Sequence, residues 1–392
     1  MTGLWDIATA LVGILILAGL ASVFLSQMAA RQHFARKTVF GLAEFLPKVS
    51  ILKPVEGTGP DTYEAFASFC RLDYPGEMEI LIGTINPDDP VVAMVGRLQQ
   101  EFPGQDIRLV LAGLQGVNRK TSIMETLWRE ASGQYLFFSD ADVFAPTDYL
   151  QQLVPQLAQP GIGCLTCLPR GIKTNTLGGK IIALHYGHNY LPQWMLALRT
   201  TGIHWAIGHT MAIPRAVLAG LDGFKSFPNH LADDYELGNR ISKLGLRVIV
   251  PSLLMDCVMP AESFGDSFAR MQRWKRTIRR SRGRQFLGVI LTYPVFWALV
   301  LAAIQPLTWW SWSMLGLVMS IRWLLAAGLE TFILSPGWPR AWWLLPVVDV
   351  VEGITFFGAY FGETVFWAGR RYTLRRDGTL APAASEITAI KS

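Results

Sequence analysis

The stretch YLFFSDAD at residues 135–142 decides the fold of the central part of this 392-residue chain. Its apolar first half predicts a buried strand, and two carboxylates, Asp140 and Asp142, follow directly at the end of that strand. Three similar apolar runs precede it, and helical patterns separate the runs. Strands that alternate with helices predict an α/β domain with a mostly parallel sheet. We expect strands at 49–52, 79–83, 107–111 and 135–139, and helices at 61–72, 90–102, 121–131 and 147–157.

The composition excludes two broad classes of protein. Hydrophobic residues make up 51% of the chain and charged residues only 17%, against roughly 25% charged in soluble domains. A disordered chain needs the opposite balance, and an entirely soluble protein is also disfavoured. Lys and Arg nevertheless exceed Asp and Glu by 35 to 30, which gives a net charge of +5. Four cysteines are too few for a disulfide framework, and Cys164 and Cys167 are expected to be core thiols.

The N-terminal segment at 7–30 carries no charge and is long enough to cross a bilayer. It is longer than the apolar part of a cleaved signal peptide, so we expect a retained membrane anchor. Only Asp6 precedes it closely, whereas Arg31, Arg36 and Lys37 follow it. The positive-inside rule then places the following domain in the cytoplasm.

A second apolar region lies at 286–369 and predicts membrane spans at 286–304 and 307–329. A third candidate at 342–368 is interrupted by Asp349, Glu352 and Glu363. Three crossings would leave the C-terminus outside, but the arginines that follow favour the inside. Either the third segment is re-entrant or interfacial, or the rule fails here. These arginines are Arg370, Arg371, Arg375 and Arg376.

Polar residues that follow the strands of a parallel sheet are candidates for a ligand site. Asp140 and Asp142 can reach one Mg²⁺ or Mn²⁺ ion bound to phosphates, or they can form a turn or helix cap. Asp89 follows the second strand, where it caps a helix or meets a nucleotide base or ribose. The segment at 116–120, GVNRK, combines a flexible glycine, basic side chains and a helix N-terminus, which suit phosphate.

Two later segments complete the pattern. Asp233 and Asp234 open a helix at 234–244, either as acids favoured by the helix dipole or as a general base. The segment at 270–274, RMQRW, starts a run of 15 residues with eight basic and no acidic side chains. This run suits an anionic membrane surface, while Arg273 suits a diphosphate. His185 and His188 are spaced for one helix face, but no carboxylate follows at ligand spacing, so we favour a structural role for them.

Taken in order, these motifs resemble those of membrane-bound glycosyltransferases with a GT-A fold, a Rossmann-like α/β fold. More closely, the chain resembles the ceramide glucosyltransferases of glycosyltransferase family 21, and it is also similar to bacterial hopanoid-biosynthesis glycosyltransferases. The resemblance covers nearly the whole chain, from the N-terminal anchor onward. Its motifs are VSILKPVEG at 49–57, LDYP at 72–75, DDP at 88–90, GVNRK at 116–120, DDY at 233–235, RMQRW at 270–274 and GRRY at 369–372.

The resemblance implies a UDP-sugar donor, a lipid hydroxyl acceptor and a divalent cation. It implies that Asp234 is the catalytic base and that Asp140, with Asp142, holds the metal. Some relatives lack an acid at the position of Asp142, and Glu is common at the position of Asp233. The donor-binding set that it implies is Lys53, Pro54, Glu56, Asp89, Lys120, Asp140, Arg273 and Trp274. Trp274 also faces the acceptor in this scheme, and the stretch at 204–211, which includes His209, is expected to line the acceptor pocket.

The expected activity is therefore inverting transfer of one sugar to a membrane lipid of the ceramide or hopanoid type. A processive polysaccharide synthase shares these motifs but needs a channel, for which three or four spans offer little material. A transporter or lipid-binding protein would use the acids of the third segment, and a nucleic-acid partner is not expected. The expected organisation is an anchor at 1–37, a cytoplasmic domain at 38–269, a basic interfacial segment at 270–285, a membrane region at 286–369 and a tail at 370–392.

Overall fold

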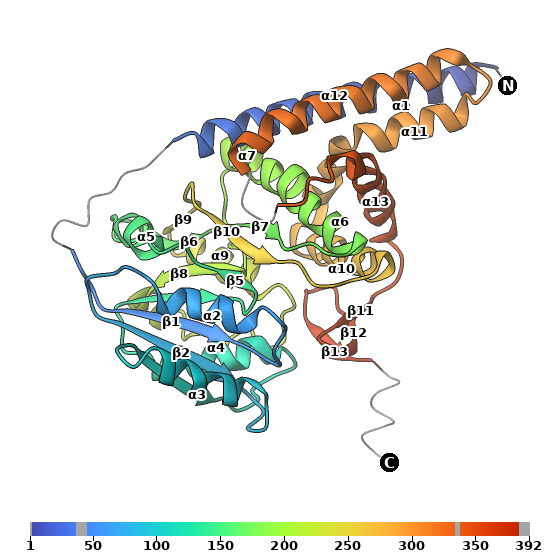
Figure 1. The fold of residues 1–392 in the computed structure, drawn as a ribbon. Coiled ribbons are helices and arrows are strands. Elements are labelled where there is room, and N and C mark those ends of the chain that lie inside the picture. Colours follow the sequence, from blue (N-terminus) through green and yellow to red (C-terminus); the bar gives the residue numbers. More distant parts are fainter. Residues whose placement is uncertain (1, 37–44, 334–337, 384–392) are drawn as a thin grey trace. The chain divides into compact units, whose positions relative to one another are not determined.

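The protein divides into two compact units in a computed structural model that describes residues 2–36, 45–333 and 338–383 (Figure 1). The helical unit contains residues 2–35, 170–202, 259–333 and 338–370, and the α/β unit contains the other described residues. Residues 170–202 lie inside the continuous domain expected at 38–269 but pack with the helical unit. The expected domain boundaries remain a prediction, and Lys37 lies outside the described residues.

Four parallel strands form one side of the main sheet, and they confirm the four strands predicted from the sequence to within two residues. β1 pairs in parallel with β2 and with β4, and β2 pairs with β3. Every residue of β1 and β4 is buried, which explains why their sequences are continuously apolar. The strands are β1 (Val49–Pro54), β2 (Met78–Thr84), β3 (Asp106–Leu111) and β4 (Tyr135–Ser139).

The rest of the main sheet continues beyond β4 in the order β3-β2-β1-β4-β8-β6-β9. β8 runs antiparallel to β4 and to β6, and β6 pairs in parallel with β9, so the sheet is mostly parallel as expected. The register places Ser139 opposite Thr210, which brings the end of β4 beside the start of β8. The added strands are β6 (Ile162–Thr166), β8 (Thr210–Pro214) and β9 (Arg247–Ile249), with β5 (Val143–Phe144), β7 (Leu168–Ile172) and β10 (Leu254–Val258) in a smaller sheet.

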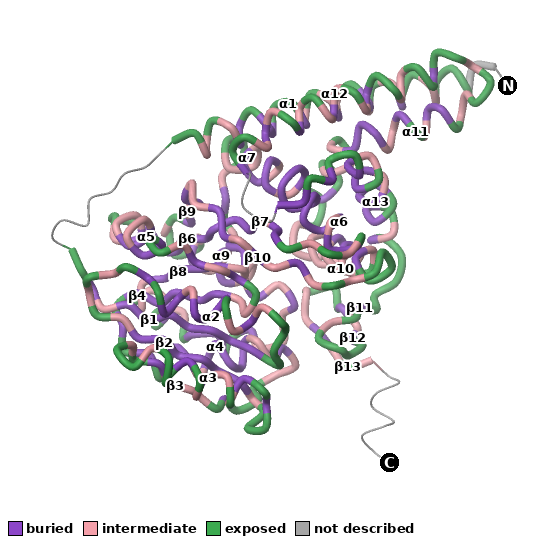
Figure 2. The backbone as a smooth tube through the Cα atoms, in the orientation of Figure 1, coloured by how far each residue is buried: buried purple, intermediate pink, exposed green. Residues whose placement is uncertain are grey.

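The helices of the α/β unit follow the predicted alternation with the strands. α4 begins after Asn118, whose side chain accepts a hydrogen bond from the amide of Thr121 at 3.2 Å. α4 packs closely on β2, since a Cβ added at Gly83 would lie 2.6 Å from Ile123. Buried residues gather along the strands (Figure 2). The helices are α2 (Thr62–Cys70), α3 (Val91–Glu101), α4 (Arg119–Glu130), α5 (Tyr149–Leu157), α8 (Arg215–Gly220) and α9 (Asp233–Lys243).

Two long apolar helices mark the helical unit as a membrane unit. α1 (Thr2–Phe34), from Trp5 onward, and α12 (Trp309–Ile333) are long and apolar enough to cross a bilayer, which confirms the predictions at 7–30 and 307–329. With α11 (Pro294–Ile304) they share an apolar core (Figure 1). Their outer faces expose large apolar side chains that suit lipid. Examples are Ile7, Leu11, Ile14, Leu17 and Leu324.

The span expected at 286–304 is not one straight helix. A 3₁₀ helix, η2 (Gly283–Thr292), precedes α11, and the chain bends by 66° between them. α11 has 11 residues, or about 16 Å of helix, which is less than the roughly 30 Å of a bilayer core. The break falls at Pro294, whose missing N–H suits the first turn of a new helix.

The third apolar segment, expected at 342–368, is also shorter than its composition suggests. η3 (Trp342–Leu344) leads into α13 (Leu345–Gly358), and β11 (Thr364–Trp367) follows. The 14 residues of α13 cover only about 21 Å, so this helix alone is too short to cross. This finding favours the re-entrant or interfacial alternative.

A second set of helices completes the helical unit. α6 (Leu177–His185) continues through a π-helical turn, η1 (Tyr186–Tyr190), into α7 (Leu191–Thr200). α7 packs against α1, and α10 (Phe264–Arg282) packs against α6 and α13. α10 begins with a capping box, in which the Ser263 and Asp266 side chains bond each other's backbone. Single π turns are rare and often occur at functional sites.

The C-terminal residues return to the α/β unit. β12 (Arg370–Leu374) and β13 (Leu380–Pro382) form an antiparallel pair. The Leu380 amide donates to the Asn229 carbonyl at 2.7 Å, and the Leu231 amide donates to the Gly378 carbonyl at 3.3 Å. These two hydrogen bonds attach the hairpin to the loop that precedes α9. Asp233 and Asp234 lie at the start of α9.

Candidate active site

Lys120 lies at the centre of a cluster of carboxylates at the carboxyl edge of the sheet. Its Nζ lies 2.5 Å from Oδ1 of Asp140 and 3.4 Å from the Gly208 carbonyl oxygen. Burial lowers the pKa of Lys120, but the charges of Asp140, Asp233 and Asp234 outweigh that effect and raise it. The site therefore holds one fixed cation among three acids contributed by β4 and α9.

Asp142 shares the turn after β4 with Asp140, and its charged form is disfavoured there. Burial and the neighbouring charge of Asp140 both raise the pKa of Asp142. Among the described residues, no three His, Cys, Asp or Glu side chains gather in a metal-binding group. Two carboxylates are enough where substrate phosphates and water complete the coordination of Mg²⁺. The two acids thus fit a divalent cation that arrives with a phosphorylated ligand.

Lys53 stabilises the turn after β4 that carries Asp140 and Asp142. It lies in β1, is fully buried, and donates from Nζ to the Asp140 carbonyl at 2.6 Å and to the Ser139 hydroxyl at 3.3 Å. Its amine also lies over the rings of Phe66 and Phe69. Burial lowers the pKa of Lys53 to about 7, although the charges of Asp140 and Asp142 oppose the shift. Lys53 therefore holds the backbone of the carboxylate turn, and its amine does not face an open site.

Asp89 cross-links the ends of β1 and β2. It is 7% exposed, and its carboxylate accepts hydrogen bonds from the amides of Gly57 and Val91 at 2.8 and 2.9 Å. A third bond comes from the Thr84 hydroxyl at 3.3 Å. These contacts match the turn-and-cap interpretation, and they also fix the loop at 55–59, where a nucleotide could lie. Pro54 ends β1 directly before this loop.

Glu56, in the same loop, forms an ion pair with Arg119. Arg119 is the first residue of α4, so the ion pair ties the loop after β1 to the helix that carries Lys120. Both side chains are partly exposed, at 33% for Glu56 and 22% for Arg119. The sequence motifs at 49–57 and 116–120 therefore meet in the structure.

The acid pair that opens α9 divides into two environments. Asp234 is half-buried, and its carboxylate accepts hydrogen bonds from the amides of Gly208 and Tyr235, both at 2.7 Å. Asp233 is 6% exposed, and burial raises its pKa to about 7 against the opposing charge of Lys120. Asp234 is thus an oriented, accessible carboxylate, and Asp233 is a buried one. Two adjacent acids in a sequence do not show which of them is buried, so the low exposure of Asp233 could not be predicted.

The loop before β8 completes the cluster. His209 precedes β8, and its carbonyl accepts a hydrogen bond from the Asp140 amide at 3.1 Å. Gly208 allows a close approach, because a Cβ there would lie 3.2 Å from Lys120 Nζ and 3.3 Å from Asp234 Oδ2. His209 therefore lies next to the carboxylate cluster, and its place in an acceptor pocket remains a prediction.

Arg273 and Trp274 lie in α10 of the helical unit. The Trp274 ring stacks on His185 and on Tyr186, with ring centroids 5.6 Å apart in both pairs. Several cations of the basic run are paired with acids of their own unit. Arg270 pairs with Glu262, Lys275 with Glu352, and Arg280 with Glu363.

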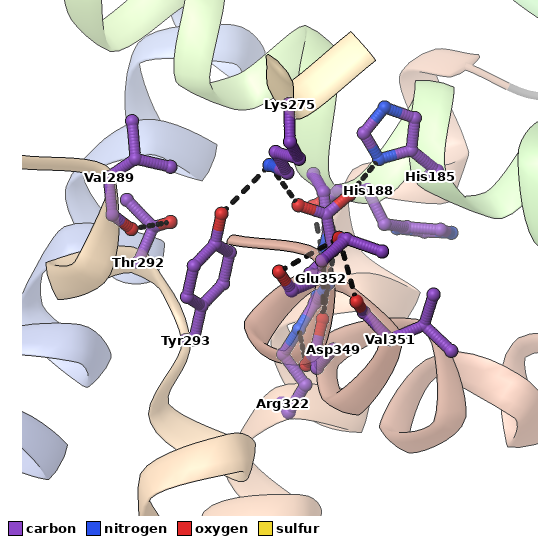
Figure 3. Close-up of polar contacts among 12 residues, drawn as sticks. His185, His188, Lys275, Val289, Thr292, Tyr293, Arg322, Asp349, Val351 and Glu352 are labelled. Carbon is purple, nitrogen blue, oxygen red and sulfur yellow. Dashed lines mark hydrogen bonds and ion pairs between the residues drawn. The ribbon is translucent and has the colours of Figure 1, made fainter. Parts of the chain in front are cut away.

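Two of the three acids that interrupt the third apolar segment, Asp349 and Glu352, belong to a buried polar network (Figure 3), whereas Glu363 is exposed. Arg322 Nε donates to Asp349 Oδ2 at 2.8 Å, and both side chains are almost fully buried. His185 contacts Glu352, and His188 Nε2 lies 3.6 Å from Glu330. The structural role favoured for the two histidines agrees with these contacts. Their partners lie far away in the sequence, so no local pattern reveals them.

Comparison with known proteins finds sequence relatives of this chain. The chain is 25% identical over 234 residues to ceramide glucosyltransferase 3 of Caenorhabditis elegans, a match that covers 58% of this chain and 50% of that protein. It is 25% identical over 304 residues to beta-monoglucosyldiacylglycerol synthase of Synechocystis, covering 75% of this chain and 58% of that protein. The matches thus span half of the first relative and 58% of the second.

The fold is also that of a solved glycosyltransferase. A mannosyltransferase from Pyrobaculum calidifontis, solved with GDP-Man and Mn²⁺, aligns with a TM-score of 0.54 at 19% identity. The alignment covers 89% of this chain and 98% of that one, which confirms the GT-A-like architecture. The family model described as glycosyl transferase family 21 matches residues 11–380, almost the full length. The chain therefore belongs to glycosyl transferase family 21.

Proposed function

We propose that this protein transfers one sugar from a UDP-sugar to a hydroxyl group of a membrane lipid, with inversion at the anomeric carbon. The observation that carries the proposal is the cluster of Lys120, Asp140 and Asp234 at the carboxyl edge of the sheet. The family membership and the two apolar helices support a membrane glycosyltransferase that makes glycolipids. The UDP donor and the inverting course are our inference.

Asp234 is the proposed general base. Amide hydrogen bonds to both oxygens hold its carboxylate in one orientation, while the side chain remains half-exposed. A lipid hydroxyl loses its proton to this carboxylate as its oxygen attacks the anomeric carbon. The bond from that carbon to the diphosphate breaks on the opposite face, and UDP leaves.

Charge on the departing diphosphate needs fixed positive partners. Lys120 supplies one, since its amine is already held at Asp140. Asp140 and Asp142 would hold a Mg²⁺ or Mn²⁺ ion, which neutralises phosphate charge when bound. Arg273 is proposed to contact the diphosphate, and Trp274 to face the acceptor.

The donor's nucleotide is proposed to lie over the ends of β1 and β2. Asp89 and Glu56 fix the loop at this edge through their contacts with Gly57 and Arg119. Pro54 shapes the exit from β1, and Lys53 holds the carboxylate turn from beneath. His209 and its neighbours are proposed to line the acceptor pocket. The domain is proposed to face the cytoplasm in a multi-pass membrane protein.

The test is the chemical identity of the product. Purified protein is mixed with UDP-glucose or UDP-N-acetylglucosamine and with ceramide, hopanoid or diacylglycerol acceptors, and products are identified by mass spectrometry. We expect one sugar per lipid, with the opposite anomeric configuration from the donor, and no product from Asp234→Asn although donor still binds. Long polysaccharide products would instead indicate a processive synthase. Lipid movement without sugar transfer would indicate a transporter.

A further inference from the structure

Glu352 is a buried carboxylate that holds two cationic partners at the centre of the helical unit. It lies on α13 and is fully buried, and its Oε2 lies 2.5 Å from Lys275 Nζ. Its other oxygen contacts Nδ1 of His185 (Figure 3). A buried charge is retained only where it is paired or coordinated. The position therefore has a specific task in the fold.

Both partners of Glu352 are attached to Trp274. Lys275 follows Trp274 in the chain and is itself buried, and its amine also donates to the Tyr293 hydroxyl at 2.8 Å. His185 stacks on the Trp274 ring, with centroids 5.6 Å apart and planes 24° apart. Glu352 thus contacts Lys275, which follows Trp274 in the chain, and His185, whose ring stacks on the Trp274 indole.

The helix that carries Trp274 is packed along the same helix that carries Glu352. The Gln272 side chain donates to the Thr355 carbonyl at 3.3 Å, one turn after Glu352. Gly358 allows this approach, because a Cβ there would lie 2.3 Å from the Gln272 amide oxygen. α10 and α13 therefore meet at Gln272 as well as at Lys275, on either side of Trp274.

We infer that Glu352 is a positioning residue that fixes the orientation of the Trp274 indole through Lys275 and His185. The inference deepens the proposed function, because it rests on the acceptor-side role proposed for Trp274. α13 then acts as a support for the site, and its acid is a positioning group of the transferase. The neutral variant Glu352→Gln leaves Lys275 and His185 without their shared anion, so that the indole is no longer held in one orientation.

The chain offers a matched control on the same helix. Asp349 lies one turn before Glu352, is 2% exposed, and is held by Arg322 and Asn189. Asp349→Asn removes an equally buried charge, but the ion pairs and hydrogen bonds of Asp349 go to residues outside α10. The two variants disturb α13 alike and differ in their connection to Trp274.

The experiment reads the indole directly, with full-length protein in detergent labelled with 5-fluorotryptophan. Trp274→Phe identifies the ¹⁹F resonance of Trp274 among the 14 tryptophans. We expect Glu352→Gln to shift or broaden that resonance and to raise the acceptor KM or lower kcat by about 10-fold or more, with the donor Kd unchanged. Asp349→Asn should leave the Trp274 resonance in place. A folded Glu352→Gln protein with an unshifted Trp274 resonance would overturn the inference.

Two further variants keep the outcomes separate. If Glu352→Gln does not fold, Tyr293→Phe removes the hydroxyl that interacts with Lys275 and Glu352. This variant should still move the Trp274 resonance, and an unmoved resonance counts against the inference. If Trp274→Ala retains full transfer, the acceptor-side role in the proposed function fails, whatever Glu352 does. If Trp274→Ala loses transfer but Glu352→Gln does not, the inference about Glu352 alone is wrong.

Discussion

Lys120 Nζ lies 2.5 Å from Oδ1 of Asp140, although the two residues are 20 positions apart in the sequence. Lys120 is in the first turn of α4, and Asp140 directly follows β4. Helix and strand thus converge on one charge pair at the carboxyl edge of the sheet, where ligands of α/β proteins bind.

Replacing Lys120 with Met should lower transfer by about 100-fold, a loss typical of removing one electrostatic stabiliser from an active site. The variant leaves Asp140, Asp233 and Asp234 without their central cation. Single-turnover rates at saturating donor and acceptor measure the effect. Arg129→Met serves as a control, because Arg129 lies on the same helix and forms its salt bridge with Glu125, outside the cluster. Equal losses in both variants would argue against a specific role for Lys120.

Replacing Gly208 with Ala should reduce transfer by about 10- to 100-fold, because small displacements of catalytic groups are costly. The added Cβ would lie 3.2 Å from Lys120 Nζ and 3.3 Å from Asp234 Oδ2, so both groups must move apart. Gly96→Ala is the matched control, since a Cβ at Gly96 meets no atom within 4 Å. We expect it to keep full activity in the same steady-state assay.

Removal of divalent cations with a chelator should stop transfer, and added Mg²⁺ or Mn²⁺ should restore it. Asp142→Asn should raise the cation concentration needed for half-maximal rate by about 10-fold or more, since outer contacts alone affect metal affinity by that factor. The dependence of rate on cation concentration measures both effects. A rate unaffected by chelation would refute the cation site at Asp140 and Asp142.

Replacing Glu79 with Gln should destabilise the α/β unit by about 2 kcal/mol, the range of a charged buried hydrogen bond. Glu79 is 1% exposed in β2, and its carboxylate accepts hydrogen bonds from Ser50 and Ser132 and pairs with Arg108. The midpoint of thermal unfolding in detergent should fall accordingly. Glu77→Gln should leave it unchanged, because the pair of Glu77 with Lys48 is exposed.

The same residue predicts a pH dependence of stability. Burial disfavours the charge of Glu79, but the hydrogen bonds and Arg108 outweigh burial and lower its pKa. A depressed pKa in the folded state means that the stabilisation is complete above the unfolded-state pKa near 4.3 and is lost as pH falls. The unfolding midpoints of the wild type and Glu79→Gln should therefore converge in acid. Parallel curves from pH 7 to pH 3 would contradict this assignment.

The regular part of the fold could be predicted from the sequence, because its signals are local. The apolar run of β4 and the alternation before it fixed four strands to within two residues. The position of Asp140 at the carboxyl edge of the sheet also followed, since the ends of parallel strands meet at one edge. Lys120 and Asp234 lie on helices, and it was the family resemblance that pointed to them as site residues. The hydrogen bonds of Asp89 with Gly57 and Thr84 could not be predicted from the sequence. They join the ends of β1 and β2, which lie far apart in the chain.

The membrane unit was predicted less well, for two physical reasons. Apolar composition predicts a span but not its straightness, so the break before Pro294 was not predicted. The short α13 agrees with the re-entrant or interfacial alternative, which the sequence left open. The acids of α13 looked like interruptions because their cationic partners, Lys275 and Arg322, lie on other helices. A salt bridge between residues 77 positions apart leaves no periodic trace in the sequence.

The C-terminal hairpin has a topological consequence for the chain. The Leu380 amide donates to the Asn229 carbonyl, the Leu231 amide donates to the Gly378 carbonyl, and these bonds hold the last described strand to the α/β unit. Both ends of the stretch between residues 258 and 371 therefore belong to one folded body. That stretch is an insertion that leaves the α/β unit and returns to it. Arg371, Arg375 and Arg376 consequently belong to the unit that carries Lys120 and Asp140, and not to the unit of the apolar helices.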